Sequence, residues 1–301
     1  MAGICSDRVV IVTGAGRGLG RAYALAFAAE GASVVINDLG TSLAGEGRDT
    51  ATAQAVVDEI VAAGGRAVAN GDDVAELDGA GRIVKTALEA FGRLDVVVNN
   101  AGVVRDRMFV SQSVEEWDAV LRVHLRGHFC VSSHAVAHWR AEQKAGRPVD
   151  ARIINTSSGA GLQGSIGQSA YSAAKGGIAS LTLVQAAELG RYGITANALA
   201  PAARTRMTET AFADKMRAPE SGFDRQDPAN IAPFVVWLGS AESRAVSGCV
   251  FDLEGGRITL CNGWNDGPTF DKGARWAPAE IGPVVARLLA DRPPQKRVWG
   301  T

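Results

Sequence analysis

Tyr171 and Lys175 are the pair of side chains in this sequence with the clearest potential for proton transfer. They lie four residues apart in a segment with helical character, so both side chains point to the same side of the helix. A phenol with a pKa of about 10 is a poor base at neutral pH. A nearby ammonium group favours the phenolate and moves its pKa toward the working range. We therefore expect Tyr171 to transfer a proton and Lys175 to assist it.

A glycine-rich turn near the amino terminus has the composition of a nucleotide-binding loop. The residues TGAGRGLG, at positions 13–20, directly follow the apolar run 9–12 and precede the alanine-rich stretch 22–29. In a strand–turn–helix unit, glycine lets the backbone approach a pyrophosphate closely, and the helix N-terminus offers free N–H groups. The spacing G-x-x-x-G-x-G differs from the commoner G-x-G-x-x-G. We predict that the turn binds a dinucleotide through Gly14, Arg17, Gly18 and Leu19.

Two further motifs complete a known pattern. The sequence Asn99-Asn100-Ala101-Gly102 follows an apolar run, and Ser158 precedes Tyr171 by 13 residues. Together with the glycine turn and the Tyr171–Lys175 pair, these motifs resemble the short-chain dehydrogenase/reductase family, from about Asp7 to about Asp252. The resemblance implies hydride transfer between an alcohol and a nicotinamide cofactor. It also implies that Ser158 orients the substrate and that Lys175, beside Tyr171, binds the nicotinamide ribose.

Strand-like apolar runs alternate with helix-like segments along the chain. This alternation predicts an α/β fold, a single doubly wound (Rossmann) domain spanning residues 1–301, with a parallel seven-stranded sheet and helices on both faces. The expected strands are Val9–Thr13, Ser33–Asp38, Arg66–Asn70, Leu94–Asn99, Arg152–Thr156, Thr195–Ala200 and Cys249–Leu253. The expected helices are Gly20–Glu30, Ala51–Ala63, Gly79–Phe91, Val114–Lys144, Ser169–Tyr192 and Pro228–Gly239.

Two stretches stand apart from this alternation. The glycine-rich stretch 41–50 lengthens the loop after the second strand, next to the expected adenosine site. The C-terminal extension, residues 254–301, is too short to form a domain. It contains one helix-like segment, Pro278–Ala290. We expect the extension to pack near the substrate cleft or against a neighbouring subunit, with a surface tail as the alternative.

Asp38 ends the second strand, 18 residues after Gly20, where a carboxylate would accept both hydroxyls of the adenosine ribose. The same carboxylate would repel a 2′-phosphate, at a cost on the order of 1–4 kcal/mol for a separation of about 4 Å. Arg17 favours the opposite choice, because in the resembling family a basic residue there often accompanies NADP. The attraction between a solvated loop arginine and the 2′-phosphate is weaker than this repulsion. The residue after Asp38 is Leu39, so it provides no second positive charge for the phosphate. We predict NAD as the cofactor.

The resemblance assigns the other cofactor contacts less directly. Asp73, with Asp72 as an alternative, and Val74 would contact the adenine. The segment containing Asn99, Ala101 and Gly102 would bend over the adenine-side ribose, although asparagine and glycine also favour plain turns. Thr205 would hold the nicotinamide carboxamide, in a loop that carries Ala202 where the family has glycine.

His124 departs from the family pattern. Most members carry an asparagine at this point, which holds a water on the proton path from the lysine to solvent. Histidine can also donate and accept hydrogen bonds, so the path could survive. We therefore include His124 among the catalytic candidates, with a satisfied interior histidine as the alternative.

Further segments sharpen the match to one subgroup, the (3R)-hydroxyacyl-CoA dehydrogenase unit of multifunctional enzyme type 2, which also oxidises 17β-hydroxysteroids. These segments are 37–40, 64–70, 105–107, 122–127 and 167–168. The resemblance implies an acyl-CoA or steroid-like substrate in lipid breakdown. A ketoacyl reductase or another alcohol dehydrogenase is the alternative. A silent dinucleotide sensor is disfavoured, because Ser158, Tyr171 and Lys175 are all present.

Composition limits the possible partners. The formal net charge of −1 provides no basic surface for nucleic acid. The four cysteines are widely spaced without a C-x-x-C pair, so we expect no metal site and a reducing cytoplasm. No apolar run reaches the length of a membrane span, so we expect no membrane association. Because the segments Val114–Lys144 and Ser169–Tyr192 are apolar on more than one face, we expect a homo-oligomer, a dimer or a tetramer.

Overall fold

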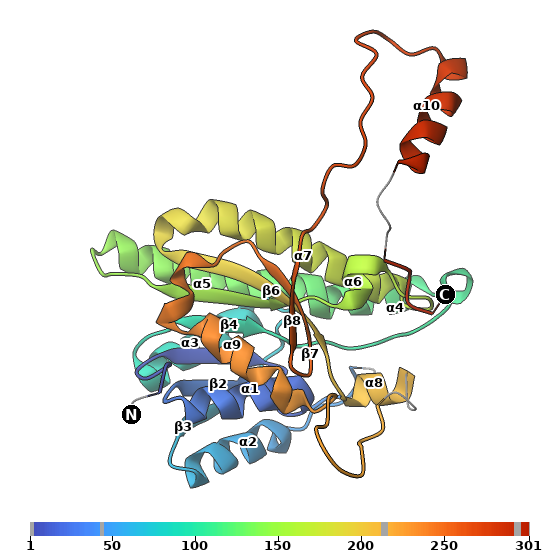
Figure 1. Ribbon diagram of the computed structural model, residues 1–301. Coiled ribbons are helices and arrows are strands. Elements are labelled where there is room, and N and C mark those ends of the chain that lie inside the picture. The colour runs from blue at the N-terminus through green and yellow to red at the C-terminus, as the bar shows by residue number, and fades with distance from the viewer. Residues whose placement is uncertain (1–2, 43–44, 212–215, 292–295, 301) are drawn as a thin grey trace.

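Eight strands form one sheet at the centre of the computed structural model, which describes residues 3–42, 45–211, 216–291 and 296–300 (Figure 1). Their order is β3-β2-β1-β4-β5-β6-β7-β8, and neighbouring strands are parallel except for the last pair. The strands are β1 (Val9–Thr13), β2 (Ser33–Asn37), β3 (Arg66–Asn70), β4 (Val96–Asn99), β5 (Ala151–Thr156), β6 (Ile194–Ala202), β7 (Val250–Glu254) and β8 (Arg257–Cys261).

Helices cover both faces of this sheet. One face packs against α1 (Gly18–Ala29), α2 (Ala51–Ala62) and α9 (Ala232–Gly239). The other face packs against α3 (Leu77–Phe91), α5 (Gly127–Lys144) and the end of α7 (Ser169–Leu189). The remaining α-helices are α4 (Val114–Leu121), α6 (Gly159–Gln163), α8 (Arg206–Ala211) and α10 (Pro278–Ala290). Strands β1, β2, β4 and β5 are buried throughout, because both sides of the sheet are covered.

The prediction of seven strands is wrong by one. Strand β8 returns antiparallel to β7, and Glu254 pairs with Arg257 across a turn formed by Gly255 and Gly256. Gly255 has a φ of +55°, which glycine adopts without strain. Two glycines between two alternating runs are a recognised hairpin signal. The predicted C-terminal extension, residues 254–301, therefore begins inside this hairpin.

The long helical segment 114–144 is not one uniform α-helix. A π-helical turn, Arg122–Arg126, joins α4 to α5 and contains His124. A π turn adds a residue to the helical repeat, so it redirects the side chains that follow it, and such turns are frequent at functional sites. The expected segment Ser169–Tyr192 is an α-helix only as far as Leu189 and ends in a 3₁₀ turn.

The C-terminal extension leaves the body of the protein and returns to it. Helix α10 has the predicted bounds, and Figure 1 shows it standing away from the sheet and its covering helices. The chain then returns to the segment after Ser158. There the N–H of Trp299 donates to the carbonyl of Gly164 at 3.1 Å, and the N–H of Ile166 donates to the carbonyl of Trp299 at 2.9 Å. Residues 292–295 and 301 of the extension lie outside the described residues.

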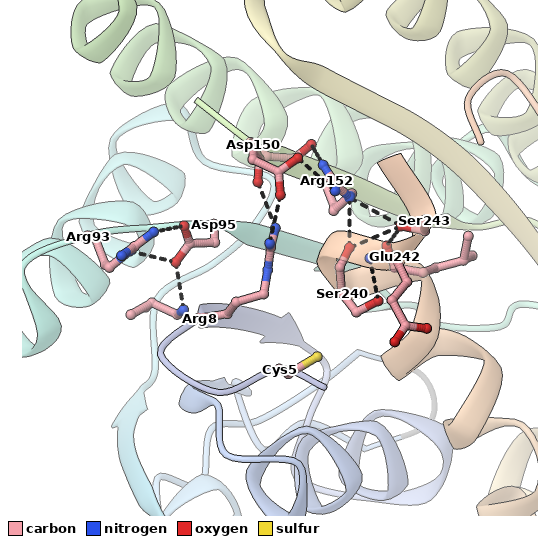
Figure 2. A network of polar contacts seen from close by, with 12 residues as sticks. Cys5, Arg8, Arg93, Asp95, Asp150, Arg152, Ser240, Glu242 and Ser243 are labelled. Atoms are coloured by element: carbon pink, nitrogen blue, oxygen red, sulfur yellow. Dashed lines mark hydrogen bonds and ion pairs between the residues drawn. The ribbon is translucent and has the colours of Figure 1, made fainter. Parts of the chain in front are cut away.

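Charged residues tie together the amino ends of the central strands. Asp150, just before β5, accepts from Arg8 at 3.0 Å and pairs with Arg152 at 2.8 Å (Figure 2). Asp95, just before β4, accepts from the N–H of Val9 at 2.8 Å. Arg152 is almost fully buried, so its charge needs these partners. This network lies at the end of the sheet opposite the carboxyl ends of the strands.

We expect Asp150→Asn to destabilise the protein by about 1–3 kcal/mol at neutral pH, because two largely buried arginines lose their counter-charge. Burial alone would raise the pKa of Asp150, but hydrogen bonds from Arg8 and Arg152 outweigh it and lower that pKa. The ion pair therefore stabilises above the unfolded-state pKa of about 3.9, and this contribution is lost as pH falls through the lower folded-state value. Urea unfolding of both proteins from pH 7 to pH 3 would test this. An unchanged midpoint at every pH would contradict it.

Candidate active site

A cavity opens at the carboxyl ends of the strands, where β1 and β4 lie next to each other and their following segments diverge. The glycine turn between β1 and α1 forms one wall. A Cβ on Gly14, whose φ is +62°, would lie 2.8 Å from the Cα of Ala101, and a Cβ on Gly20 would lie 2.1 Å from the carbonyl oxygen of Gly14. These positions therefore require glycine. The predicted residues Gly14, Arg17, Gly18 and Leu19 all line the cavity.

The second asparagine of the Asn99-Asn100 pair, and not the first, supports the glycine turn. Asn100 donates through its side-chain amide to the carbonyls of Thr13 at 3.0 Å and Gly14 at 3.2 Å, and it lines the cavity. The side chain of Asn99 lies inside the protein, where it donates to Asn155 at 3.0 Å. Among the described residues that line the cavity, Ala101 and Gly102 are present and Asn99 is not.

Asp38 lies beside the glycine turn at one end of the cavity. Its carboxylate accepts from the N–H of Gly16 at 2.8 Å and from the N–H of Gly40 at 2.7 Å, so its direction is fixed. Arg17 also lines the cavity, but its guanidinium donates to Thr52 at 3.1 Å. A ribose bound on this side would lie next to the fixed carboxylate of Asp38, while the Arg17 guanidinium is hydrogen-bonded to Thr52 of α2.

The other predicted cofactor residues also reach the cavity. Asp73 and Val74 line it, and Asp73 accepts from Arg122 at 2.7 Å. Asp72, the alternative, lines the cavity too, but its carboxylate pairs with Arg82 at 2.6 Å. Thr205 lies across from the glycine turn, and its N–H donates to the hydroxyl of Thr208 at 2.8 Å.

Tyr171 and Lys175 line the other end of the cavity, and Ser158 lies beside Tyr171 without lining the cavity itself. Tyr171 and Lys175 lie on α7, and the ammonium nitrogen of Lys175 is 5.6 Å from the centre of the Tyr171 ring. Ser158 begins α6, where its hydroxyl accepts from the N–H of Ala160 at 3.2 Å, and it hydrogen-bonds the Tyr171 phenol. The structure therefore brings together the three residues that the sequence predicts for the chemical step.

The electrostatics of this pair differ from the expectation. Burial raises the pKa of Tyr171 above its ordinary value, and the hydrogen bond with Ser158 only partly opposes this rise. Burial also lowers the pKa of Lys175 to about 7. The lysine is thus partly neutral at pH 7, and the protein alone does not favour the phenolate. Additional positive charge in the cavity would lower the pKa of Tyr171 and favour its phenolate form.

His124 lies in the π turn, with its ring edge toward Tyr171 at 5.2 Å between ring centres. Its Nε2 is 2.8 Å from the carbonyl oxygen of Val103, and its Nδ1 is buried without a protein partner. Burial, followed by the charge of Lys175, lowers the pKa of His124 to about 3, so the ring is neutral. If Nε2 donates to the Val103 carbonyl, then Nδ1 is an acceptor; Nε2 is also 3.1 Å from the Val103 N–H nitrogen, and if it accepts there, then Nδ1 is a donor.

We expect His124→Ala to lower kcat by roughly 100-fold, the low end of the usual range for proton-transfer groups, while NAD binding changes less. His124→Asn, which keeps a side chain that can accept and donate, should retain more activity than alanine. Steady-state kinetics and a dinucleotide titration of the two variants would separate these effects. Equal, near-wild-type rates for both would show that His124 has a structural role only.

The cavity fits an extended dinucleotide. A glycine cradle that admits no side chain, uncapped N–H groups at the start of α1 and a carboxylate at one end suit a pyrophosphate and a ribose. Tyr171 and Lys175 at the other end suit a nicotinamide ribose. Among the described residues, no cluster of three or more His, Cys, Asp or Glu side chains could hold a metal ion, and no helix could span a membrane.

Comparison with known proteins agrees with this geometry. The short chain dehydrogenase family model matches residues 8–217, so the chain belongs to the short-chain dehydrogenase/reductase family of oxidoreductases, which use nicotinamide dinucleotides. The chain is 42% identical to hydroxyacyl-CoA dehydrogenase ChsB1 of Mycobacterium tuberculosis, over 98% of this chain and 93% of that protein. It is 48% identical to peroxisomal multifunctional enzyme type 2 of Mus musculus, over 83% of this chain but 32% of that protein.

A solved structure confirms the predicted Rossmann fold. The crystal structure of a short chain dehydrogenase from Mycobacterium avium has a TM-score of 0.90 and 59% sequence identity to this chain. The match covers 99% of this chain and 100% of the other. The predicted resemblance to the family and to its hydroxyacyl-CoA dehydrogenases is therefore confirmed.

Several residues that support the site were not predicted from the sequence. Arg206 and Thr208 line the cavity but belong to no recognised motif, and Arg122 lies in the quoted segment 122–127 without an assigned role. Asn100 was visible in its motif, and strand alternation could have identified it, because Asn99 is the last residue of β4 and its side chain points into the protein. No sequence signal identifies Thr156, which lines the cavity and whose backbone carbonyl accepts from Lys175 at 2.6 Å.

Proposed function

We propose that the protein is an NAD-dependent dehydrogenase of secondary alcohols, which oxidises (3R)-hydroxyacyl-CoA to 3-ketoacyl-CoA. The observation that carries this proposal is the arrangement at the two ends of one cavity. Ser158, Tyr171 and Lys175 adjoin one end, and the fixed carboxylate of Asp38 lies at the other. The names of the two similar proteins support the substrate class.

In the proposed reaction, the Ser158 hydroxyl hydrogen-bonds the alcohol oxygen, and Tyr171 in its phenolate form removes the alcohol proton and becomes the phenol. Bound in the cavity, the oxidised nicotinamide would accept the hydride. Lys175 would hold the nicotinamide ribose and supply positive charge beside the phenol. His124 Nδ1 would accept from a water molecule on the path by which the proton leaves.

The choice of NAD is supported by Asp38. Its carboxylate is held toward the cavity by two backbone N–H groups, so it cannot easily turn away from a 2′-phosphate. The guanidinium of Arg17 donates to the hydroxyl oxygen of Thr52 at 3.1 Å. A surface arginine contributes little binding free energy to a phosphate that a nearby carboxylate repels.

The substrate class is further supported by apolar residues around the Ser158 segment. Met108, Phe109 and Val110 are exposed, and the preceding residue, Arg107, donates through its N–H to the carbonyl of Gly167 at 2.8 Å. Trp299 packs against the same segment, because a Cβ on Gly159 would lie 3.0 Å from its indole ring. An exposed apolar rim of this kind suits an acyl chain or a steroid.

A spectrophotometric screen of NAD reduction would test the proposed function. We expect the highest kcat/KM with (3R)-hydroxyacyl-CoA, and the (3S) epimer is the matched control. Preference for 17β-hydroxysteroids, or faster turnover of 3-ketoacyl substrates with the reduced cofactor, would favour the alternative substrates or direction. Absence of turnover with every alcohol and ketone would overturn the proposal.

We further propose that the protein is a homo-oligomer, a dimer or more favourably a tetramer. Helices α5 and α7 carry exposed apolar residues, among them Phe129, Leu183 and Val184, which a second copy would cover. Helix α10 also exposes Ile281, Val285 and Leu289. Light scattering at micromolar concentration should give a mass at least twice 31.3 kDa. A fully active monomer would contradict this prediction.

A further inference from the structure

His128 is a second buried histidine, one helical turn after His124, and the chemistry proposed above does not use it. It lies on α5 and is 2% exposed. A buried imidazole needs hydrogen-bond partners, and its partners show what it holds in place.

The Nε2 atom of His128 accepts from the N–H of Thr156 at 3.3 Å. Thr156 is the last residue of β5. The N–H of Arg152 donates to the backbone carbonyl of Asp95 on the β4 side, and alternate residues of a strand present their N–H groups to the same side. Strand β4 ends at Asn99, which pairs with Asn155, so the N–H of Thr156 lies at the last position of this ladder, on the side of the Asn99 carbonyl. His128 adds an imidazole acceptor to this N–H where the two strands separate.

The carbonyl of Thr156 faces the same side and holds the catalytic lysine. The ammonium group of Lys175 donates to this oxygen at 2.6 Å. One residue of backbone is therefore held at its N–H by an imidazole from α5 and at its carbonyl by an ammonium group from α7. Thr156 also lines the cavity, so the three residues connect α5 to the reactive end of the site.

The charge state of His128 suits this role. Burial lowers its pKa well below the ordinary value, the positive charge of Lys175 on α7 adds to this shift, and hydrogen bonds with the backbone of His124 and Asn99 oppose it only partly. The ring is therefore neutral and has one donor and one acceptor. Since Nε2 accepts from Thr156, the proton lies on Nδ1.

We propose that His128 is a positioning residue for Lys175, because it fixes the Thr156 backbone whose carbonyl orients the lysine. This inference rests on the proposed dehydrogenase function. If it is correct, loss of the acceptor at position 128 shifts the Thr156 carbonyl, and Lys175 is then misplaced relative to Tyr171 and the nicotinamide ribose.

The test compares His128→Leu, which removes the acceptor at similar volume, with His128→Gln, whose side-chain carbonyl can still accept from Thr156. We expect the leucine variant to lose about 10- to 100-fold in kcat, the scale of small misplacements in active sites. In a plot of kcat/KM against pH, its activity should rise at a higher pH than that of the wild type, because the misplaced lysine no longer lowers the pKa of Tyr171. The glutamine variant should stay near wild type in both respects. His138→Gln, on the same helix, is the matched control.

Each result decides the question. A leucine variant that melts lower but keeps the wild-type kcat and pH profile below its melting temperature would show a structural role only and overturn the inference. If the leucine variant does not fold, His128→Met takes its place in the same comparison.

If the wild type turns over no substrate, the proposed function fails, and titration with NAD decides the inference by itself. The dissociation constant of His128→Leu should then rise toward that of Lys175→Met, while that of His128→Gln should not. Equal constants for the leucine variant and the wild type would overturn it.

Discussion

Replacing Tyr171 with phenylalanine is expected to remove nearly all turnover while NAD binding stays close to the wild-type value. Only the hydroxyl group is lost, and the ring can keep its edge contact with His124. Loss of a general acid–base group costs roughly 10²–10⁴-fold in rate or more. Steady-state kinetics on the best substrate and a fluorescence titration with NAD would measure the two quantities.

Tyr192→Phe is the matched control, because Tyr192 lies beyond the end of α7, where its ring packs against Arg140 and Arg191. This variant should keep wild-type turnover. If Tyr171→Phe retained most of its activity, another group would have to transfer the proton, and the proposed mechanism would be wrong.

Replacing Asp38 with alanine should raise the KM for NAD by about 10- to 100-fold, because hydrogen bonds to a charged acceptor contribute roughly 1.5–3 kcal/mol each. The same change should improve use of NADP relative to NAD, since the repulsion of a 2′-phosphate disappears. The N–H groups of Gly16 and Gly40 also lose their acceptor, so part of the loss would come from a less ordered turn. Paired kcat/KM values for the two cofactors would measure both effects.

Asp38→Asn separates these contributions, because the amide keeps one acceptor oxygen and loses the charge. It should relax discrimination against NADP while the KM for NAD rises less than in the alanine variant. A wild-type enzyme that prefers NADP would refute the assignment and would give Arg17 the leading role.

The sequence predicted the parallel sheet and the shared helical face of Tyr171 and Lys175 from local patterns, whereas Ser158 was assigned from the resemblance to the family. Buried parallel strands are continuous apolar runs, and Tyr171 and Lys175 share a helical face whatever surrounds them. Strand β8 was missed because its alternation is short and exposed, although the Gly255-Gly256 turn marks it. The π turn at His124 was missed because its sequence does not differ visibly from that of an α-helix.

Tertiary contacts explain what the sequence could not give. The position of Asn99 in the interior depends on Asn155, which is 56 residues away in sequence. The hydrogen bonds of Thr156 involve its backbone, so its side chain gives no sign of them. The pKa of Tyr171 depends on how deeply it is buried, and burial reverses the direction expected from Lys175 alone.

The buried ammonium group of Lys175 also affects the folding equilibrium. In the unfolded chain a lysine has a pKa of about 10.4, whereas in the folded protein that of Lys175 falls to about 7. Between these values the unfolded state binds one more proton, so folding releases a proton and this site becomes less unfavourable as pH rises from 7 to 10. Below pH 7 the fold must keep a charge away from water. Lys175 therefore lowers the stability of the folded protein below pH 7, and we expect a neutral side chain in its place to stabilise the fold while removing the positive charge that the proposed mechanism needs beside Tyr171.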